Sequence, residues 1–344
     1  MSKKKAEAAA KPGGVRGGSR SAEGVKICEK PRGRAMGAVK PEERPADSYR
    51  QAVKMKRLNE RIQIKLRAYW ELTKSKQTFL LLITGWAGYA SAGGPATDWA
   101  TLLSLLGSLY LAVSGSTVLN MYVARDIDAR MPRTIKRPLP AGVLRPREAL
   151  AFGSLISVLG VAWAFSLSPL FGLVVAAGLF FHAVIYTMWL KRMTPFSVIP
   201  GGVSGGMPVL AGRVLGTGSI DLIGALLAVA ILLWIPIHIL TFAMRYSRDY
   251  DLAGVPTFPA VYGEKQTRLV LAGSTVLTGL ALMLAVFLNG VRGPYLSASI
   301  LSVALLVALA VFCSAFPTPK RNFLLFKAAS IYMLASMLLI GLAG

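Results

Sequence analysis

The sequence predicts an all-α membrane protein with nine transmembrane helices and a disordered basic N-terminal tail, and three observations lead to this fold class. Of the 344 residues, 54% are hydrophobic and only 16% are charged. Nine segments after residue 76 are apolar over roughly 20 residues, the length that a helix needs to cross a bilayer core. The formal charge of +23 is concentrated in the first 67 residues and in alternate loops.

The same composition excludes several other classes. A strongly positive charge is typical of nucleic-acid-binding proteins, but these are rarely so rich in Leu, Val and Ala, so we expect no nucleic-acid partner. The two cysteines, Cys28 and Cys313, cannot form a disulfide framework. Residues 1–46 are rich in Gly, Pro, Lys and Arg without an apolar period, which predicts a disordered basic tail and not a secretory signal peptide.

Residues 47–72 are predicted to form an amphipathic juxtamembrane helix. Their larger apolar side chains recur at helical spacing on one stripe, and lysines and arginines surround it. The stripe consists of Met55, Leu58, Ile62, Leu66 and Tyr69. This pattern is typical of a helix that lies on an anionic leaflet. A solvated tether without fixed contacts is the alternative interpretation.

Residues 73–344 form the third predicted region, which contains the nine spans. Their ranges are 77–96, 100–123, 149–167, 169–190, 196–214, 220–242, 269–289, 294–315 and 323–343. When the connecting loops are assigned to alternate sides, fifteen lysines and arginines fall on the side of the tail, and only Arg213 and Arg292 fall on the other. By the positive-inside rule, this multi-pass protein of the cell membrane has a cytoplasmic N-terminus and an outside C-terminus.

The first polar motif extends the second span into the cytoplasmic mouth at residues 120–139, NMYVARDIDARMPRTIKRPL. Asn120 places an amide where the span should be apolar, which favours a functional role. On a continuous helix Asn120 and Asp128 share a face, whereas Asp126 points elsewhere unless the helix has ended. Such oxygen ligands suit Mg²⁺, and the cations that follow suit a diphosphate. A solvated loop would explain Arg145 and Arg147 but not Asn120.

The second polar motif follows the sixth span at residues 245–263, RYSRDYDLAGVPTFPAVYG. It repeats the same chemistry at a helix end, with Asp249 and Asp251 among arginines and tyrosines. Two acidic motifs on separate helices that face one mouth can hold a metal–diphosphate complex between them. The sequence therefore predicts a functional site at the cytoplasmic face.

These motifs resemble those of the UbiA superfamily of intramembrane prenyltransferases, and within it the heme O synthases (protoheme IX farnesyltransferases). Four elements agree in order along roughly residues 68–343: DIDARMPRTIKRPLPAG at 126–142, YTMWLKRMTP at 186–195, GGVSGGMPVLAG at 201–212 and DYDLAGVPTFPAVYG at 249–263. The resemblance implies nine helices around a central cavity, with Mg²⁺ as the cofactor. It also implies farnesyl diphosphate and heme B as substrates in a setting of membrane lipid, and a heme A synthase as a further partner.

The resemblance also assigns roles to individual residues. The implied metal ligands are Asn120, Asp126, Asp128, Asp249 and Asp251. The implied diphosphate contacts are Arg133, Arg137, Arg248 and Tyr250, with Asp128, Asp249 and Lys191 as catalytic residues. His238, in Trp-Ile-Pro-Ile-His, is implied as a heme-side residue. One position departs from the family pattern, because Ala124 stands where an acid is expected between Asn120 and Asp128; unless Asp126 replaces that acid, metal affinity falls or the substrate differs.

The implied reaction joins the farnesyl group to the vinyl group of heme B, with uptake of water, and yields heme O and diphosphate. It needs no nucleophilic side chain, and the sequence shows no Ser/His/Asp or Cys/His arrangement. Two alternatives stay open. The acceptor could be a quinone precursor or an archaeal glycerol lipid. The chain could also be a transporter or a catalytically altered relative that binds heme or a polyprenyl lipid.

Overall fold

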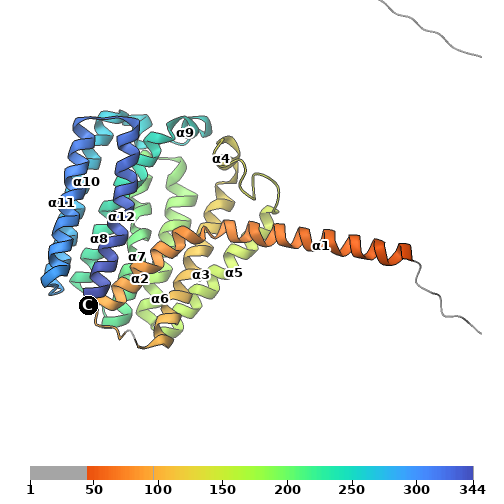
Figure 1. Cartoon of the computed structure of the whole chain (residues 1–344), viewed down its shortest axis with the longest axis horizontal. Helices are drawn as coiled ribbons and strands as arrows, with labels where there is room; N and C mark the ends of the chain where they lie inside the picture. Colours follow the sequence, from red (N-terminus) through yellow and green to blue (C-terminus); the bar gives the residue numbers. More distant parts are fainter. Residues whose placement is uncertain (1–44, 96, 344) are drawn as a thin grey trace, which may run out of the picture. The chain divides into compact units, whose positions relative to one another are not determined.

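The structure, a computed structural model, describes residues 45–95 and 97–343, and all secondary structure within them is helical. The predicted disordered tail, residues 1–46, lies outside the described residues except for its last two positions. The chain divides into two units, residues 1–54 and 55–344. The larger unit contains a bundle of long helices (Figure 1). The predicted all-α membrane fold is therefore confirmed.

The α-helices are α1 Pro45–Leu72, α2 Ser75–Ser91, α3 Trp99–Val123, α4 Arg125–Arg130, α5 Pro146–Leu167, α6 Pro169–Phe180, α7 Val198–Thr217, α8 Leu222–Arg245, α9 Ser247–Ala253, α10 Phe258–Leu288, α11 Gly293–Ala315 and α12 Pro319–Ala343. A π-helix, η1 (Phe181–Trp189), continues α6, and two short 3₁₀ turns, η2 (Leu190–Arg192) and η3 (Pro195–Ser197), lead to α7. The fourth predicted span is therefore a composite of α6, η1 and η2.

The number of full-length spans differs by one from the prediction. Within the described residues, eight helical segments are long and apolar enough to cross a membrane. The predicted span 77–96 corresponds to α2, whose 17 residues cover about 26 Å at 1.5 Å per residue. A bilayer core is roughly 30 Å thick, so α2 does not reach across it unaided. It still packs inside the bundle, against α7 and α12.

Both polar motifs form short helices at one end of the bundle. Figure 1 shows α4 and α9 at this end and the C-terminus of the chain at the other. The predicted seventh span, 269–289, begins earlier than expected, because α10 starts at Phe258 and bends at Gly263. Gly263 has a φ of 78°, which a residue without a Cβ adopts at little cost.

The stripe of α1 is only partly covered by protein. Tyr69 packs edge-on against Phe152 of α5, with ring centroids 4.9 Å apart, and Leu72 is fully buried. Met55 and Leu58 remain about half exposed, at 55% and 48%. An apolar stripe without a protein partner is the arrangement expected of a helix at a membrane surface. That location stays a prediction.

The glycine-rich element at 201–212 lies in α7 and allows close contact with α2. A Cβ added at Gly212 would collide with the carbonyl oxygen of Gly85, and one added at Gly88 would collide with the carbonyl oxygen of Val209. Membrane helices associate closely through such small residues. The backbones of α2 and α7 are therefore in direct contact at these glycines.

Arg213 joins several helices at the end of the bundle opposite α4 and α9. Its Nε donates to both carboxylate oxygens of Asp221, at 2.9 and 2.8 Å. Its Nη1 donates to the carbonyl oxygen of Ser91 at 2.8 Å and to Oδ1 of Asn289 at 2.9 Å. These contacts connect α2, α7, the start of α8 and the end of α10. Arg213 is therefore a structural residue.

Candidate active site

α3 and α4 meet at Ala124, where φ and ψ of −89° and 8° depart from the helix. The row of backbone hydrogen bonds nevertheless continues. The Ala124 amide donates to the Asn120 carbonyl at 2.9 Å, and the Asp128 amide donates to the Ala124 carbonyl at 2.8 Å. Residues four apart share a helix face, so Asn120 and Asp128 lie in one row. Both are buried, with 9% and 4% of their surface exposed.

A small apolar cluster joins the two motifs. It contains residues of α4 and its ends together with the last residue of α9 and one just beyond it: Ala124, Ile127, Met131, Ala253 and Val255. Ala124, which stands at the position of the expected acid, is thus a packing residue between the first and second motifs. The cluster fixes α4 beside α9, and so places the first motif beside the second.

Asp128 forms a paired contact with an arginine of its own motif. Nη1 of Arg137 donates to Oδ1 at 2.9 Å and to Oδ2 at 2.8 Å. The hydroxyl of Thr134 donates to the Asp128 carbonyl at 2.8 Å, which holds the intervening turn. A buried carboxylate therefore has its charge balanced by a guanidinium group that is itself only a quarter exposed.

Asp249 is linked to the first motif by a longer ion pair. Its Oδ2 lies 3.8 Å from Nε of Arg133. The Arg133 guanidinium stacks on the rings of Phe242 and Tyr246, at 4.9 and 5.0 Å from their centroids. Tyr250 lies among the same charges, since Arg133, Arg137 and both aspartates act on it, and burial raises the pKa of its hydroxyl.

Asn120 is oriented by the π-helix. Its Nδ2 donates to Oγ1 of Thr187 at 2.8 Å, and this hydroxyl donates to the carbonyl of His182 at 2.6 Å. The contact uses the nitrogen of the amide and leaves Oδ1 as an oxygen ligand. π-helical turns occur frequently at functional sites, and here one positions the partner of a predicted ligand.

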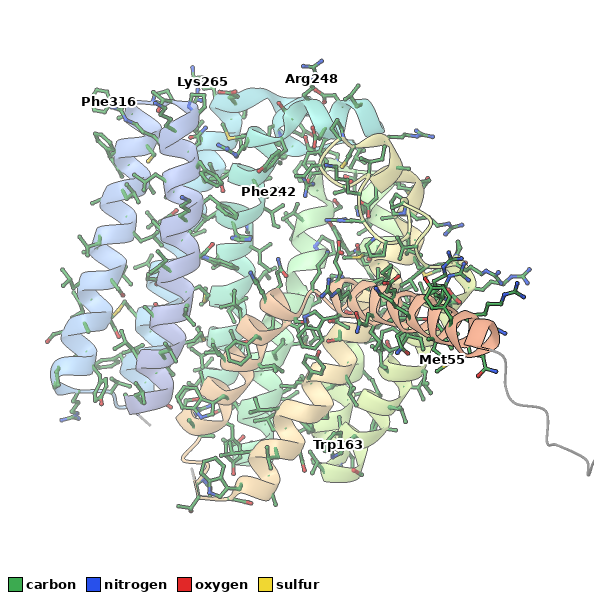
Figure 2. The ribbon with its side chains drawn as sticks, turned by 45° about the vertical axis from the view of Figure 1, so that its right-hand side comes forward. Met55, Trp163, Phe242, Arg248, Lys265 and Phe316 are labelled. Carbon is green, nitrogen blue, oxygen red and sulfur yellow. The ribbon has the colours of Figure 1, made fainter. Side chains whose placement is uncertain are left out.

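Three predicted residues lie further out. Asp126 accepts two hydrogen bonds of 2.7 Å from Arg192, which lowers the pKa of its carboxyl to about 2. Arg248 and Asp251 are exposed, and Figure 2 shows Arg248 at the end of the bundle. Within the described residues, no three His, Cys, Asp or Glu side chains gather closely enough to hold a metal. The roles of Asp126 and Asp251 as metal ligands and of Arg248 as a diphosphate contact stay predictions.

Two lysines complete the cluster. Lys191, in η2, lies close enough to Asp128 and Arg137 for their charges to interact. Lys74, between α1 and α2, was not predicted. It has φ and ψ of 45° and 50°, a left-handed conformation that costs about 1 kcal/mol. Burial lowers its pKa to about 8, and the charges of Arg137 and Lys191 act in the same direction. Its sequence signal is only a cation directly before the first span.

His238 lies between α8 and α12. Its ring stacks on Trp234, with centroids 4.8 Å apart, and on Phe326, at 4.5 Å. Nδ1 shares a hydrogen bond of 3.1 Å with the Ser330 hydroxyl. These are the contacts of a histidine packed in a helix interface, and its role on the heme side stays a prediction.

The chain is similar to members of a known enzyme family. Residues 81–336 match the model of the UbiA prenyltransferase family. The chain is 44% identical over 277 residues to the protoheme IX farnesyltransferase of Archaeoglobus fulgidus, a match that covers 80% of this chain and 95% of that protein. It is 42% identical over 232 residues to the protoheme IX farnesyltransferase of Korarchaeum cryptofilum, with 67% and 78% covered.

Solved structures share the fold. A digeranylgeranylglyceryl phosphate synthase gives a TM-score of 0.68 at 21% identity, covering 81% of this chain and 98% of its own. A UbiA homologue from Archaeoglobus fulgidus bound to GPP and Mg²⁺ gives a TM-score of 0.59 at 15% identity, covering 79% and 99%. Because the family model matches most of its length, the chain belongs to the UbiA prenyltransferase family.

Proposed function

We propose that this prenyltransferase transfers the farnesyl group of farnesyl diphosphate to the vinyl group of heme B, with uptake of water, giving heme O and diphosphate. Its resemblance to proteins named protoheme IX farnesyltransferase, such as those 44% and 42% identical to it, supports this substrate pair. The structural observation that carries the proposal is the pair of contacts Asp128–Arg137 and Asp249–Arg133 on adjoining motifs. Carboxylates suit a metal, and guanidinium groups suit a diphosphate.

The residues present fit a magnesium ion. Asn120 and Asp128 lie in one buried row, and Asp249 lies on the adjoining α9. Mg²⁺ in proteins is commonly held by one or two carboxylates, water and substrate phosphates. When bound, the ion would supply positive charge to the leaving diphosphate. The UbiA homologue solved with GPP and Mg²⁺ supports this cofactor.

The cations of the cluster would bind the diphosphate. Arg133 and Arg137 each have a planar fork of donors that matches phosphate oxygens. Lys191 and Lys74 add two ammonium groups from η2 and from the α1–α2 turn. Tyr250 lies among these charges, and its protonated hydroxyl can donate to an oxygen of the leaving group. No side chain forms a covalent bond in this scheme.

We assign His238 to the heme side of the site. The hydrogen bond between Nδ1 and Ser330 holds the ring in place, so Nε2 is the nitrogen left for a contact with heme. Histidines that bind metals commonly use one ring nitrogen for such a supporting contact. Trp234 and Phe326, whose rings contact His238, add aromatic side chains of the kind that a porphyrin favours.

The decisive experiment is conversion of heme B by the purified protein. With farnesyl diphosphate and Mg²⁺ present, mass spectrometry should detect heme O, and omission of the metal should abolish it. Formation of diphosphate with a quinone precursor or a glycerol lipid, but not with heme B, would assign the other acceptor. Absence of any prenyl transfer would contradict the proposal.

A further inference from the structure

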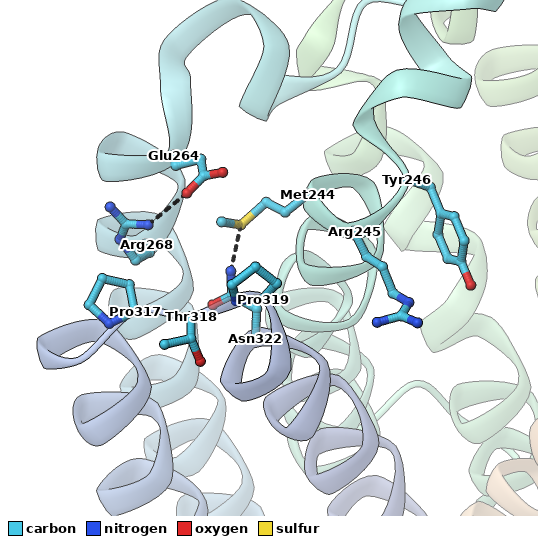
Figure 3. Close-up of a pocket in the computed structure, with 9 residues that line it drawn as sticks. All are labelled: Met244, Arg245, Tyr246, Glu264, Arg268, Pro317, Thr318, Pro319 and Asn322. Atoms are coloured by element: carbon cyan, nitrogen blue, oxygen red, sulfur yellow. Dashed lines mark hydrogen bonds and ion pairs between the residues drawn. The ribbon is translucent and has the colours of Figure 1, made fainter.

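A cavity of about 500 Å³ opens beside the candidate active site, between α8, α10 and the start of α12 (Figure 3). Its polar lining comes from Arg245, Tyr246, Glu264, Arg268, Thr318 and Asn322. Of these residues only Tyr246 touches the site described above, through its contact with Arg133. The cavity therefore needs its own explanation.

The lining carries an excess of positive charge. Nη1 of Arg268 lies 3.0 Å from Oε2 of Glu264, one turn away on α10. Arg245 stacks on Phe323, with its guanidinium carbon 4.1 Å from the ring centroid, and pairs with no carboxylate of the described residues. In Figure 3 the Asn322 side chain lies between these two arginines. The lining thus has two guanidinium groups and one carboxylate, a composition that favours binding of an anion.

Asn322 supplies an independent sign of a ligand. It is only 8% exposed, yet the single contact of its amide nitrogen in the described part of the chain is to Sδ of Met244, at 3.9 Å. A thioether is a weak acceptor, so a buried donor is left nearly unsatisfied. Asn322 also lies in the first turn of α12, where the helix dipole favours negative charge.

Tyr246 connects this cavity to the diphosphate cluster. Its ring centroid lies 5.0 Å from the guanidinium carbon of Arg133 and 5.7 Å from that of Arg245. Tyr246 therefore borders both the proposed leaving-group site and the cavity. A molecule anchored here by an acidic group would have its body close to the prenyl donor.

We propose that this cavity is an oxyanion-binding site and, on the basis of the proposed function, that it holds a propionate carboxylate of the heme acceptor. Heme B carries two carboxylates, and Arg245 presents a fork that binds a carboxylate through two hydrogen bonds. The phosphate of an anionic lipid has the same chemistry and is the other source of such a group.

The first test compares heme B with its dimethyl ester as the acceptor. The wild-type protein should prefer the free acid. Arg245→Gln should reduce the ratio of the two rates about tenfold, the loss expected when one hydrogen bond to a charged group is removed. Arg245→Lys should retain part of it. The exposed Arg292→Gln, at the other end of the bundle, is the matched control and should keep the wild-type ratio.

The second test measures lipid binding by native mass spectrometry, with phosphatidylglycerol or phosphatidylcholine. Loss of a phosphatidylglycerol adduct in Arg245→Gln, with the heme preference intact, would identify the lipid phosphate as the ligand. No effect of Arg245→Gln or Asn322→Leu on either measurement would overturn the site. If neither the wild-type protein nor any variant forms heme O, the proposed function fails. The lipid measurement then still tests whether the cavity binds an oxyanion.

Discussion

Single residues set the charge of the active site. Asp128 is buried with its carboxylate against Arg137, so its loss removes both a metal ligand and the partner of a guanidinium group. Lys74 is held in a left-handed conformation and has a lowered pKa. Strained residues are commonly found at functional sites, where the surrounding structure compensates their cost.

Asp128→Asn should lower kcat by about 100-fold or more, because an amide cannot supply the charge needed to hold the metal against the leaving group. The measurement is the rate of heme O formation at saturating Mg²⁺. Glu60→Gln, an exposed acid on α1, is the control and should retain the wild-type rate. A fully active Asp128→Asn protein would contradict the proposed metal site.

Lys74 should give prenyl transfer a pH dependence. With a pKa of about 8, it is mostly charged below pH 8 and neutral above it, so kcat/KM for the prenyl diphosphate should fall as the pH rises through about 8. Lys74→Arg, which stays charged, should remove this fall. Lys74→Ala should lower kcat/KM at pH 7 by about tenfold. An unchanged profile in all three proteins would exclude a role in binding.

At the scale of elements, close backbone contact holds α2 in the bundle although it is too short to span the membrane unaided. The contact depends on Gly88 and Gly212, where an added Cβ would collide with the main-chain oxygens of Val209 and Gly85. Main-chain atoms cannot move aside as the end of a side chain can. The packing of α2 against α7 is therefore specified by the absence of side chains.

Gly212→Ala should lower the thermal stability of the detergent-solubilised protein, because overpacking typically costs about 1–3 kcal/mol. Gly273→Ala in α10 is the matched control, since a Cβ there would meet no atom within 4 Å. That control should be neutral or slightly stabilising, as Ala favours a helix over Gly by up to about 1 kcal/mol. Equal melting temperatures for the two variants would refute the close contact.

Arg213→Met should cost about 3 kcal/mol of unfolding free energy, near the lower limit for breaking a buried ion pair, because Asp221 is partly exposed. The carbonyl of Ser91 and the amide of Asn289 lose a donor at the same time. Thermal unfolding in detergent is the measurement. The double variant Arg213→Met, Asp221→Asn should recover part of the loss, because it removes the unpaired charge and keeps an oxygen that caps α8 through the Gly224 amide. No recovery would show that the Asp221 charge is not the source of the loss.

At the scale of the whole molecule, the two ends of the bundle have different chemistry. One end carries both polar motifs, the lysines and the cavity beside Tyr246, while the other carries the Arg213 contacts and the C-terminus. Positive charge on one side of a membrane protein fixes its orientation during insertion. We therefore expect the motifs at the cytoplasmic surface.

Cysteine labelling in intact cells should verify this orientation. In a variant without Cys28 and Cys313, Arg292→Cys should react with a membrane-impermeant maleimide from outside. Lys265→Cys, which lies at the same end as Arg248 (Figure 2), should react only after the membrane is opened. The reverse pattern would place the active site on the outer surface.

The sequence predicts what depends on neighbours along the chain and misses what depends on distant contacts. Spans follow from long apolar runs, and the common row of Asn120 and Asp128 follows from their spacing of eight. α2 ends at Ser91 before a Gly-Gly-Pro turn, earlier than its apolar composition indicates. The partner of Asp126 is Arg192, 66 residues away, and Lys74 joins the cluster only through tertiary packing. No local pattern contains such contacts.

The contact of Nη1 of Arg137 with both carboxylate oxygens of Asp128 has a consequence for the order of ligand binding. A lone Mg²⁺ ion that takes the carboxylate leaves the guanidinium without a counter-charge, and a lone diphosphate that takes the guanidinium does the same to the carboxylate. Only the two ligands together give every charge a new partner. Their binding should therefore be positively coupled, each raising the affinity of the other by the same factor.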